Sequence, residues 1–265
     1  MLVGRLFSGK WIVATILSTV AIGVMVRLGI WQLDRLEQRR AFNAQVLEQV
    51  QKKQLVLTGD NLLLNLTSME YRKVLVRGRY DFSQEVALRN QVWNDQIGVH
   101  LLTPLRISGS DQTVIVDRGW IPQEAYLTGE WSAFAESGDV EIEGIIRMPQ
   151  SKADFGNLAD PTAIPGERLD SWNLANIEQM SKQMSYPILP VYVQQFPEEN
   201  RTKMPYRMAI LPELSEGSHM SYAIQWFAFA AILAVGYPVY VKREQQRKLV
   251  EGFDVIRKAE NTYNQ

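Results

Sequence analysis

Two long apolar runs dominate the pattern of hydrophobic and polar positions along the chain. The first extends from Trp11 to Ile30, and the second extends from about Met220 to Val241. Each is close to the roughly 20 residues that a helix needs to cross a hydrocarbon core of about 30 Å. Aromatic residues, which favour membrane interfaces, stand at the ends of both runs, namely Trp11, Trp31, Tyr222 and Tyr240. The pattern predicts two transmembrane helices, at residues 11–31 and 219–241.

A cleaved signal peptide is the alternative interpretation of the first run. The run is long for the apolar region of a signal peptide, and no A-x-A-like cleavage site follows it. The next segment, "WQLDRLEQRR", continues in a helical pattern. We therefore expect the first helix to be retained and to extend beyond its apolar run.

Between the two runs the pattern changes to short alternating or β-branched stretches that turn residues separate. Six of these stretches predict strands: "YRKVLVRGRYD", "EVALRNQ", "GVHLLTPLRISG", "QTVIVDRGWIP", "VEIEGIIRMPQ" and "LPVYVQQF". The segment "ISGSDQT" predicts a hairpin turn, and "NLANIEQMSKQM" predicts a short helix that Asn173 or Asn176 can cap. Residues 32–218 should therefore form an antiparallel barrel or sandwich that is closed or nearly closed.

Basic residues beside the two spans predict how the chain crosses the membrane. They are Arg5 and Lys10 before the first span, and Lys242, Arg243, Arg247 and Lys248 after the second. By the positive-inside rule, segments 1–10 and 242–265 are cytoplasmic and residues 32–218 are extracytoplasmic. Arg35, Arg39 and Arg40 conflict with this rule, but long translocated domains largely escape it. No Arg- and Ser-rich extension precedes the first span, so we expect a bacterial plasma membrane.

Composition and motifs exclude several functions. The formal net charge of −1 gives no basic field for nucleic acid, and the absence of cysteine excludes disulfides, thiolate metal sites and cysteine nucleophiles. The chain contains no G-x-S-x-G, P-loop or H-E-x-x-H motif. Its two histidines are His100, which we expect to be a packed or hydrogen-bonded strand residue, and His219. The sequence predicts a membrane protein of the α+β class that is not an enzyme, with two transmembrane helices flanking an extracytoplasmic antiparallel β-rich domain.

His219 stands at the start of the second span, where a polar side chain is costly and indicates a function. On a helical wheel Ala223, Trp226 and Ala230 share its face, and Tyr222 lies beside them. This face could hold a flat apolar ring with its iron over the imidazole, because neutral imidazole is the usual proximal ligand of haem. Alternatively, its small residues let another helix approach, with histidine and tyrosine as interfacial anchors. Wheel geometry alone favours the helix contact.

Four segments resemble motifs of the surfeit locus protein family of cytochrome c oxidase assembly factors. "GIWQLDRL" resembles the family's G-x-W-Q-x-x-R-L motif, and "GVHLLTPL" resembles G-x-x-x-x-T-P-L. "VIVDRGWIP" resembles [N/D]-R-G-W-[V/I]-P, and "SHMSYAIQWFAFA" resembles H-x-x-Y-A-x-Q-W-F. The motifs keep the family's order from Gly29 to Ala230, between two flanking spans as in the family. Ser218 stands where members often have asparagine, which leaves the partner of the imidazole open.

This resemblance implies a role in assembly. Members promote maturation of subunit I of haem–copper oxidases, and bacterial members are thought to bind haem a and help to place it. The implied partners are subunit I, the haem a synthesis machinery and membrane lipid. The resemblance makes His219 the expected iron ligand, with Tyr222 and Trp226 beside the haem. A scaffold that holds an oxidase intermediate without touching haem is the alternative.

The two anionic propionates of such a haem would need cationic partners. Arg27, Arg35 or Arg118 could supply them through charge-assisted hydrogen bonds. Trp120, which follows Arg118 and Gly119 at a strand end, is expected near the haem as well. The alternative for Arg118 and Trp120 is a strand-end turn with a tryptophan lid.

Overall fold

The computed structural model describes residues 9–152, 159–161, 167–198, 203–208 and 211–263. The chain forms two compact units, one made of residues 1–43 with 214–265 and the other of residues 44–213. Helix α2 (Ile12–Gln51) passes from the first unit into the second. Arg5 of the predicted cytoplasmic segment lies outside the described residues.

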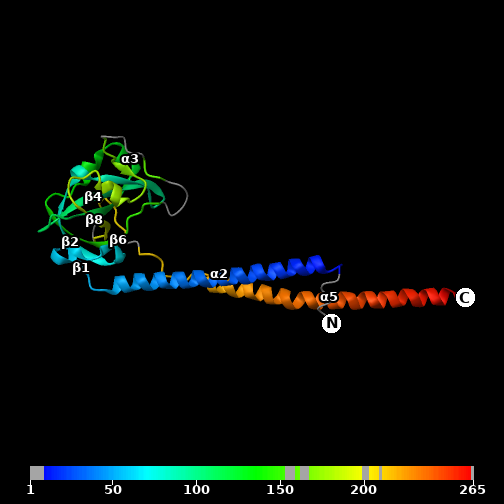
Figure 1. Cartoon of the computed structure of the whole chain (residues 1–265). Helices are drawn as coiled ribbons and strands as arrows, with labels where there is room; N and C mark the ends of the chain where they lie inside the picture. Colours follow the sequence, from blue (N-terminus) through cyan, green and yellow to red (C-terminus); the bar gives the residue numbers. More distant parts are fainter. Residues whose placement is uncertain (1–8, 153–158, 162–166, 199–202, 209–210, 264–265) are drawn as a thin grey trace. The chain divides into compact units, whose positions relative to one another are not determined.

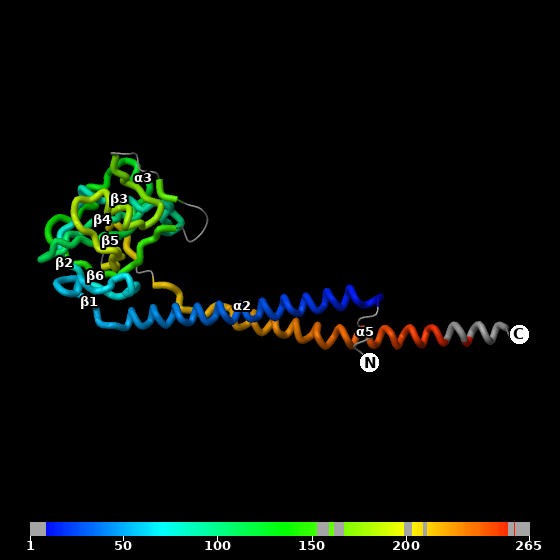
Figure 2. The backbone as a smooth tube through the Cα atoms, viewed as in Figure 1, coloured from blue at the N-terminus to red at the C-terminus, as the bar shows by residue number. Residues whose placement is uncertain are grey.

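Two long antiparallel helices, α2 and α5 (His219–Tyr263), form the first unit. They lie side by side in Figures 1 and 2, and their contacts include a hydrogen bond of 2.8 Å between Thr15 Oγ1 and the Tyr237 hydroxyl. Each contains a stretch long and apolar enough to cross a membrane, and only 11 % of that stretch is buried within the protein. Most of this apolar surface therefore needs an apolar environment outside the chain. Helix α2 continues beyond its apolar run to Gln51, as predicted.

The described part of the second unit is a β-rich domain. Its strands are β1 (Leu55–Val56), β2 (Lys73–Tyr80), β3 (Val86–Trp93), β4 (Gln96–Ile107), β5 (Thr113–Pro122), β6 (Asp139–Arg147), β7 (Ser171–Trp172) and β8 (Ile188–Gln195). Its short helices are α3 (Gln123–Leu127) and α4 (Ile177–Ser181), and its 3-10 turns are η1 (Gly59–Leu63), η2 (Leu66–Ser68), η3 (Phe82–Gln84) and η4 (Glu130–Phe134). Each of the six predicted stretches forms a strand. The Asn176 side chain accepts a hydrogen bond from the Gln179 N–H, so Asn176, and not Asn173, caps α4.

Five of the strands close into a barrel. The sheet has the order β1-β2-β6-β8-β5-β4-β3-β7, and β2 pairs with β4 as well, which closes the ring. Four pairs in this ring are antiparallel, as predicted, whereas β5 and β8 are parallel. A closed ring with an odd number of strands cannot alternate in direction at every pair, so at least one parallel pair is required. The predicted barrel is thus confirmed, and its closure explains this exception.

Strand β5 lies at the centre of the packing. Val114 and Val116 belong to the main core cluster, which strands of the barrel line. Ile115 faces a second cluster, where it is buried with Trp172 of β7 and Met180 of α4. Because β5 is covered on both faces, residues 117–121, which follow Val116 along the strand, are buried as well.

His100 of β4 forms a buried pair with Asp117 of β5. Its Nδ1 lies 2.8 Å from one carboxylate oxygen of Asp117, whose other oxygen accepts the Gly119 N–H at 3.0 Å. Burial alone would lower the pKa of His100, but the charge and hydrogen bond of Asp117 raise this pKa above its usual value. The expectation that His100 is a hydrogen-bonded strand residue is confirmed.

This pair should make the stability of the domain depend on pH. A histidine whose pKa is raised by folding stabilises the fold below its unfolded pKa of about 6.5, and this contribution is lost as pH rises through the folded value. Asp117→Asn keeps an oxygen for Gly119 N–H and removes the charge. We expect the parent to melt at a higher temperature than this variant at about pH 6, with the difference narrowing toward about pH 9. Thermal unfolding in detergent measures it, and a difference that does not change with pH would contradict the prediction.

Candidate functional site

A hydrogen bond joins the start of α5 to the end of the apolar run of α2. His219 Nδ1 lies 2.8 Å from Gln32 Oε1, although the two residues are 187 positions apart in the chain. Because an amide oxygen only accepts, Nδ1 of the neutral ring carries the proton. The lone pair of the imidazole is then on Nε2, the nitrogen that remains available to a Lewis acid.

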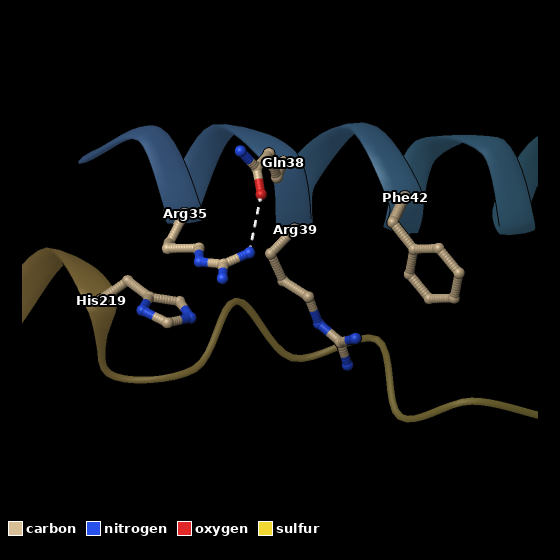
Figure 3. Close-up of a pocket in the computed structure, with 5 residues that line it drawn as sticks. All are labelled: Arg35, Gln38, Arg39, Phe42 and His219. Carbon is tan, nitrogen blue, oxygen red and sulfur yellow. Dashed lines mark hydrogen bonds between the residues drawn. The ribbon is translucent and has the colours of Figure 1, made fainter. Parts of the chain in front are cut away.

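The imidazole lines a pocket on the surface of α2. The other lining residues are Arg35, Gln38, Arg39 and Phe42. Figure 3 shows Arg35, Arg39 and Phe42 extending from α2 toward the segment that carries His219. Gly217 borders the imidazole on the other side, because a Cβ built on it would lie 3.8 Å from His219 Nε2. Gly217 has a φ of +66°, a conformation that glycine adopts without strain.

Two cationic side chains give this pocket positive charge. Arg35 donates to Gln38 Oε1 at 3.0 Å, and its guanidinium lies 5.7 Å from the centre of the Trp31 ring. Arg39 donates to the Ser215 carbonyl at 3.0 Å and lies 5.3 Å from the Phe42 ring centre. Gln38 and Trp31 are neutral, so these contacts orient the Arg35 guanidinium without cancelling its charge.

The segment that leads into α5 is fixed to α2 just beyond the pocket. Arg40 forms two hydrogen bonds with the Glu216 carboxylate, at 2.8 and 2.9 Å. The hydrogen bond from Arg40 and the charge of Arg40 hold the pKa of Glu216 below its usual value. Asn43 donates to the Leu214 carbonyl at 2.9 Å. These contacts determine where α5 begins, and therefore where His219 lies.

Small residues set the contact between the helices on the membrane side of the pocket. A Cβ built on Gly29 would lie 2.7 Å from the tip of the Phe227 ring. Ala223 is 1 % exposed and Ala230 is 5 % exposed. Ala223 lies between His219 and Phe227 on α5, and both of these contact α2. The alanine face of α5 therefore packs against α2. The other interpretation of this face was a groove for a flat ring, and α2 occupies that groove.

The structure does not bring Tyr222 and Trp226 of α5 together with His219 in one site, although the helical wheel predicted this. Tyr222 is 48 % exposed, and Trp226 packs edge-to-face against Phe229 with 6.3 Å between ring centres. Of the predicted residues on α2 and α5, His219 and Arg35 line the pocket together, whereas Tyr222, Trp226 and Arg27 are not among its lining residues.

Arg118 is buried in the core of the second unit. Its side chain is 0 % exposed and donates to Glu85 at 2.8 Å, to Glu136 at 3.2 Å and to the Phe134 carbonyl. The guanidinium also lies 4.9 Å from the Phe82 ring centre. Two carboxylates thus already neutralise it, and this arrangement does not fit a partner for haem propionates.

Trp120 is also a core residue, at 1 % exposure. Its ring stacks on Tyr206 with 6.2 Å between centres, and its indole N–H donates to the Gln91 carbonyl at 3.3 Å. Gly119 has a φ of +114°, and a Cβ there would lie 2.4 Å from the Tyr206 carbonyl oxygen. The structure fits the alternative interpretation, a strand end covered by tryptophan.

Four pocket or partner residues were not predicted from the sequence: Gln32, Gln38, Arg39 and Phe42. One signal could have found Gln32. Two spans that cross a membrane in opposite directions place the end of the first beside the start of the second. Polar residues just after Trp31 should therefore lie near His219.

Two long apolar helices at either end of a closed β domain, with an imidazole at the helix junction, define a helix-anchored β-barrel protein. The model of the SURF1 family matches residues 19–231. The chain belongs to the SURF1 family, whose members are cytochrome oxidase assembly factors rather than catalysts.

Relatives from distant organisms support this assignment. The SURF1-like protein of Rickettsia bellii (strain RML369-C) is 26 % identical over 249 residues, which cover 89 % of this chain and 92 % of that protein. Surfeit locus protein 1 of Mus musculus is 26 % identical over 169 residues, which cover 58 % of this chain and 53 % of that protein. The SURF1-like protein of Monosiga brevicollis is 24 % identical over 236 residues, which cover 82 % of this chain and 83 % of that protein. The two apolar helices and the bacterial relative fit a membrane protein.

Proposed function

We propose that this protein binds haem a through His219 and aids its insertion into subunit I of cytochrome c oxidase. The observation that carries the proposal is the hydrogen bond of 2.8 Å from His219 Nδ1 to Gln32, which leaves Nε2 as a ligand at a pocket with two arginines. Bound haem a would supply an iron centre, and His219 Nε2 would hold it.

The charge at the pocket suits the anionic edge of such a ligand. Arg35 and Arg39 follow the apolar run of α2, so they lie where an apolar ligand in the membrane would place its charged groups. Charge-assisted hydrogen bonds from guanidinium to carboxylate are among the stronger ones. Among the three arginines predicted from the sequence, Arg35 is therefore the propionate partner we propose, and Arg39 joins it.

We further propose that both termini are cytoplasmic in a bacterial plasma membrane and that residues 32–218 are extracytoplasmic. Lys242, Arg243, Arg247 and Lys248 directly follow the second apolar stretch, which supports this orientation. The site at His219 is then at the outer interface, within reach of the haem a synthesis machinery and of subunit I. Membrane lipid surrounds the exposed faces of α2 and α5.

The test is to purify the protein from a membrane that makes haem a, and to record its visible spectrum and extracted haem. His219→Ala and His219→Gln remove the ligand, and Gln225→Ala is the matched control, since Gln225 is an exposed polar residue of α5 that bonds to Ser221. We expect haem a in the parent and in Gln225→Ala, and its loss from both His219 variants. Haem retained without the imidazole would refute His219 as the ligand. If the parent protein contained no haem while oxidase assembly still depended on the protein, it would be the alternative scaffold.

A further inference from the structure

We propose that Gln32 is the positioning residue of His219, which selects the tautomer and the ring orientation that present Nε2. The inference deepens the proposed function, because it concerns the same imidazole. Gln32 Oε1 lies 2.8 Å from Nδ1, and both residues are half-buried at the contact of the two helices.

The physical reason is that a free histidine side chain rotates and exchanges its proton between the two ring nitrogens. A ligating imidazole therefore needs an acceptor at its other nitrogen, which fixes the tautomer and the orientation of the ring. In this chain the acceptor is a neutral amide. A carboxylate at the same place would pull the Nδ1 proton more strongly and make the imidazole a stronger donor to iron. The amide thus orients the ring and would leave the imidazole a weaker donor to iron than a carboxylate would, which suits a ligand that would be passed on.

Helix packing on both sides of Gln32 holds the acceptor in place. One turn before it, Gly29 lets the Phe227 ring lie directly against α2. Two turns after it, Arg40 holds Glu216, just before the start of α5. These contacts on both sides of Gln32 keep its amide within hydrogen-bond distance of His219.

The direct test is ¹⁵N NMR of the ligand-free protein labelled with ¹⁵N-histidine. The chain has two histidines, so two imidazole signals are expected, and His100→Gln assigns them. In the parent, His219 should carry its proton on Nδ1 at a pH where the ring is neutral. Gln32→Leu should shift the tautomer equilibrium of His219 toward the form with the proton on Nε2. Gln225→Leu, which changes an exposed residue of α5 outside the pocket, should leave the signal unchanged.

A second readout links the tautomer to the ligand. Gln32→Leu should weaken haem a binding by about 10–100-fold, which is typical of losing such a partner of a ligating histidine. Gln32→Glu, which keeps an acceptor, should retain haem and raise the iron–imidazole stretching frequency in Raman spectra. An Nε2–H tautomer in the parent, or parental tautomer and affinity in Gln32→Leu, would overturn the role of Gln32. Haem retained by His219→Ala would refute the proposed function instead. The NMR result, obtained without haem, would still test the role of Gln32.

Discussion

Replacing Arg118 by leucine should lower the free energy of unfolding of the β domain by about 3–5 kcal/mol, the usual cost of breaking a buried ion pair from one side. The change leaves the Glu85 carboxylate, which is 4 % exposed, with the Thr103 hydroxyl as its remaining hydrogen-bond donor among the residues that the structure describes. It also removes the donor that joins β5 to Glu136 and to the Phe134 carbonyl. Chemical denaturation in detergent, followed by tryptophan fluorescence, measures the loss.

Two further variants separate the buried ion pair from a general effect of losing an arginine. Arg79→Ala removes an exposed partner of Asp139, and we expect a change within about 1 kcal/mol. Adding Glu85→Gln to Arg118→Leu removes the uncompensated charge and keeps an oxygen for Thr103, so it should restore part of the stability. An Arg118→Leu protein as stable as Arg79→Ala would contradict the role of this network in the fold.

Ala223→Leu should weaken haem binding without changing any residue that lines the pocket. Ala223 is 1 % exposed between the helices, and extra methyl groups at a packed position force neighbouring groups apart. One turn before Ala223 on α5, His219 bonds to Gln32, and one turn after it, Phe227 lies against Gly29, so both contacts would be displaced. We expect the haem a content to fall as far as in Gln32→Leu, by about 10–100-fold in affinity.

The matched control is Ala228→Leu, which adds the same atoms on an exposed face of α5 and should bind haem as the parent does. A second readout needs no haem. In the ligand-free protein, the ¹⁵N signals of His219 should shift toward the form with the proton on Nε2 in Ala223→Leu and should stay as in the parent in Ala228→Leu. Equal haem content in the two leucine variants would mean that helix packing does not control the site.

Much of the fold could be predicted because its signals are local. Run length identifies α2 and α5, and alternation identifies β2 to β6 and β8. The parallel pair of β5 and β8 could not be predicted, since the sequence of a strand does not indicate which strand pairs with it. That pairing follows from the closure of the whole ring, which appears only when all five strands are in place.

Only the part of the site that depends on local signals could be predicted. A helical wheel describes one helix at a time, so it identified His219 and could not identify Gln32, which belongs to the other helix. It also could not show which residues cover Ala223. The sequence suggested Arg118 as a propionate partner because charged residues at strand ends are usually exposed. Its burial depends on Glu85 and Glu136, which come from other segments of the chain.

The separation of Gln32 and His219 along the chain has a consequence for biosynthesis. The ribosome makes Gln32 early, with the first span, and His219 only after the whole β domain. Strand β8 lies between β6 and β5, so the barrel cannot close until synthesis has reached Gln195. Helix α5 is made last, and its imidazole then meets an amide that was made at the start of synthesis. A chain that stops before His219 therefore has α2 and the barrel but lacks the imidazole that pairs with Gln32.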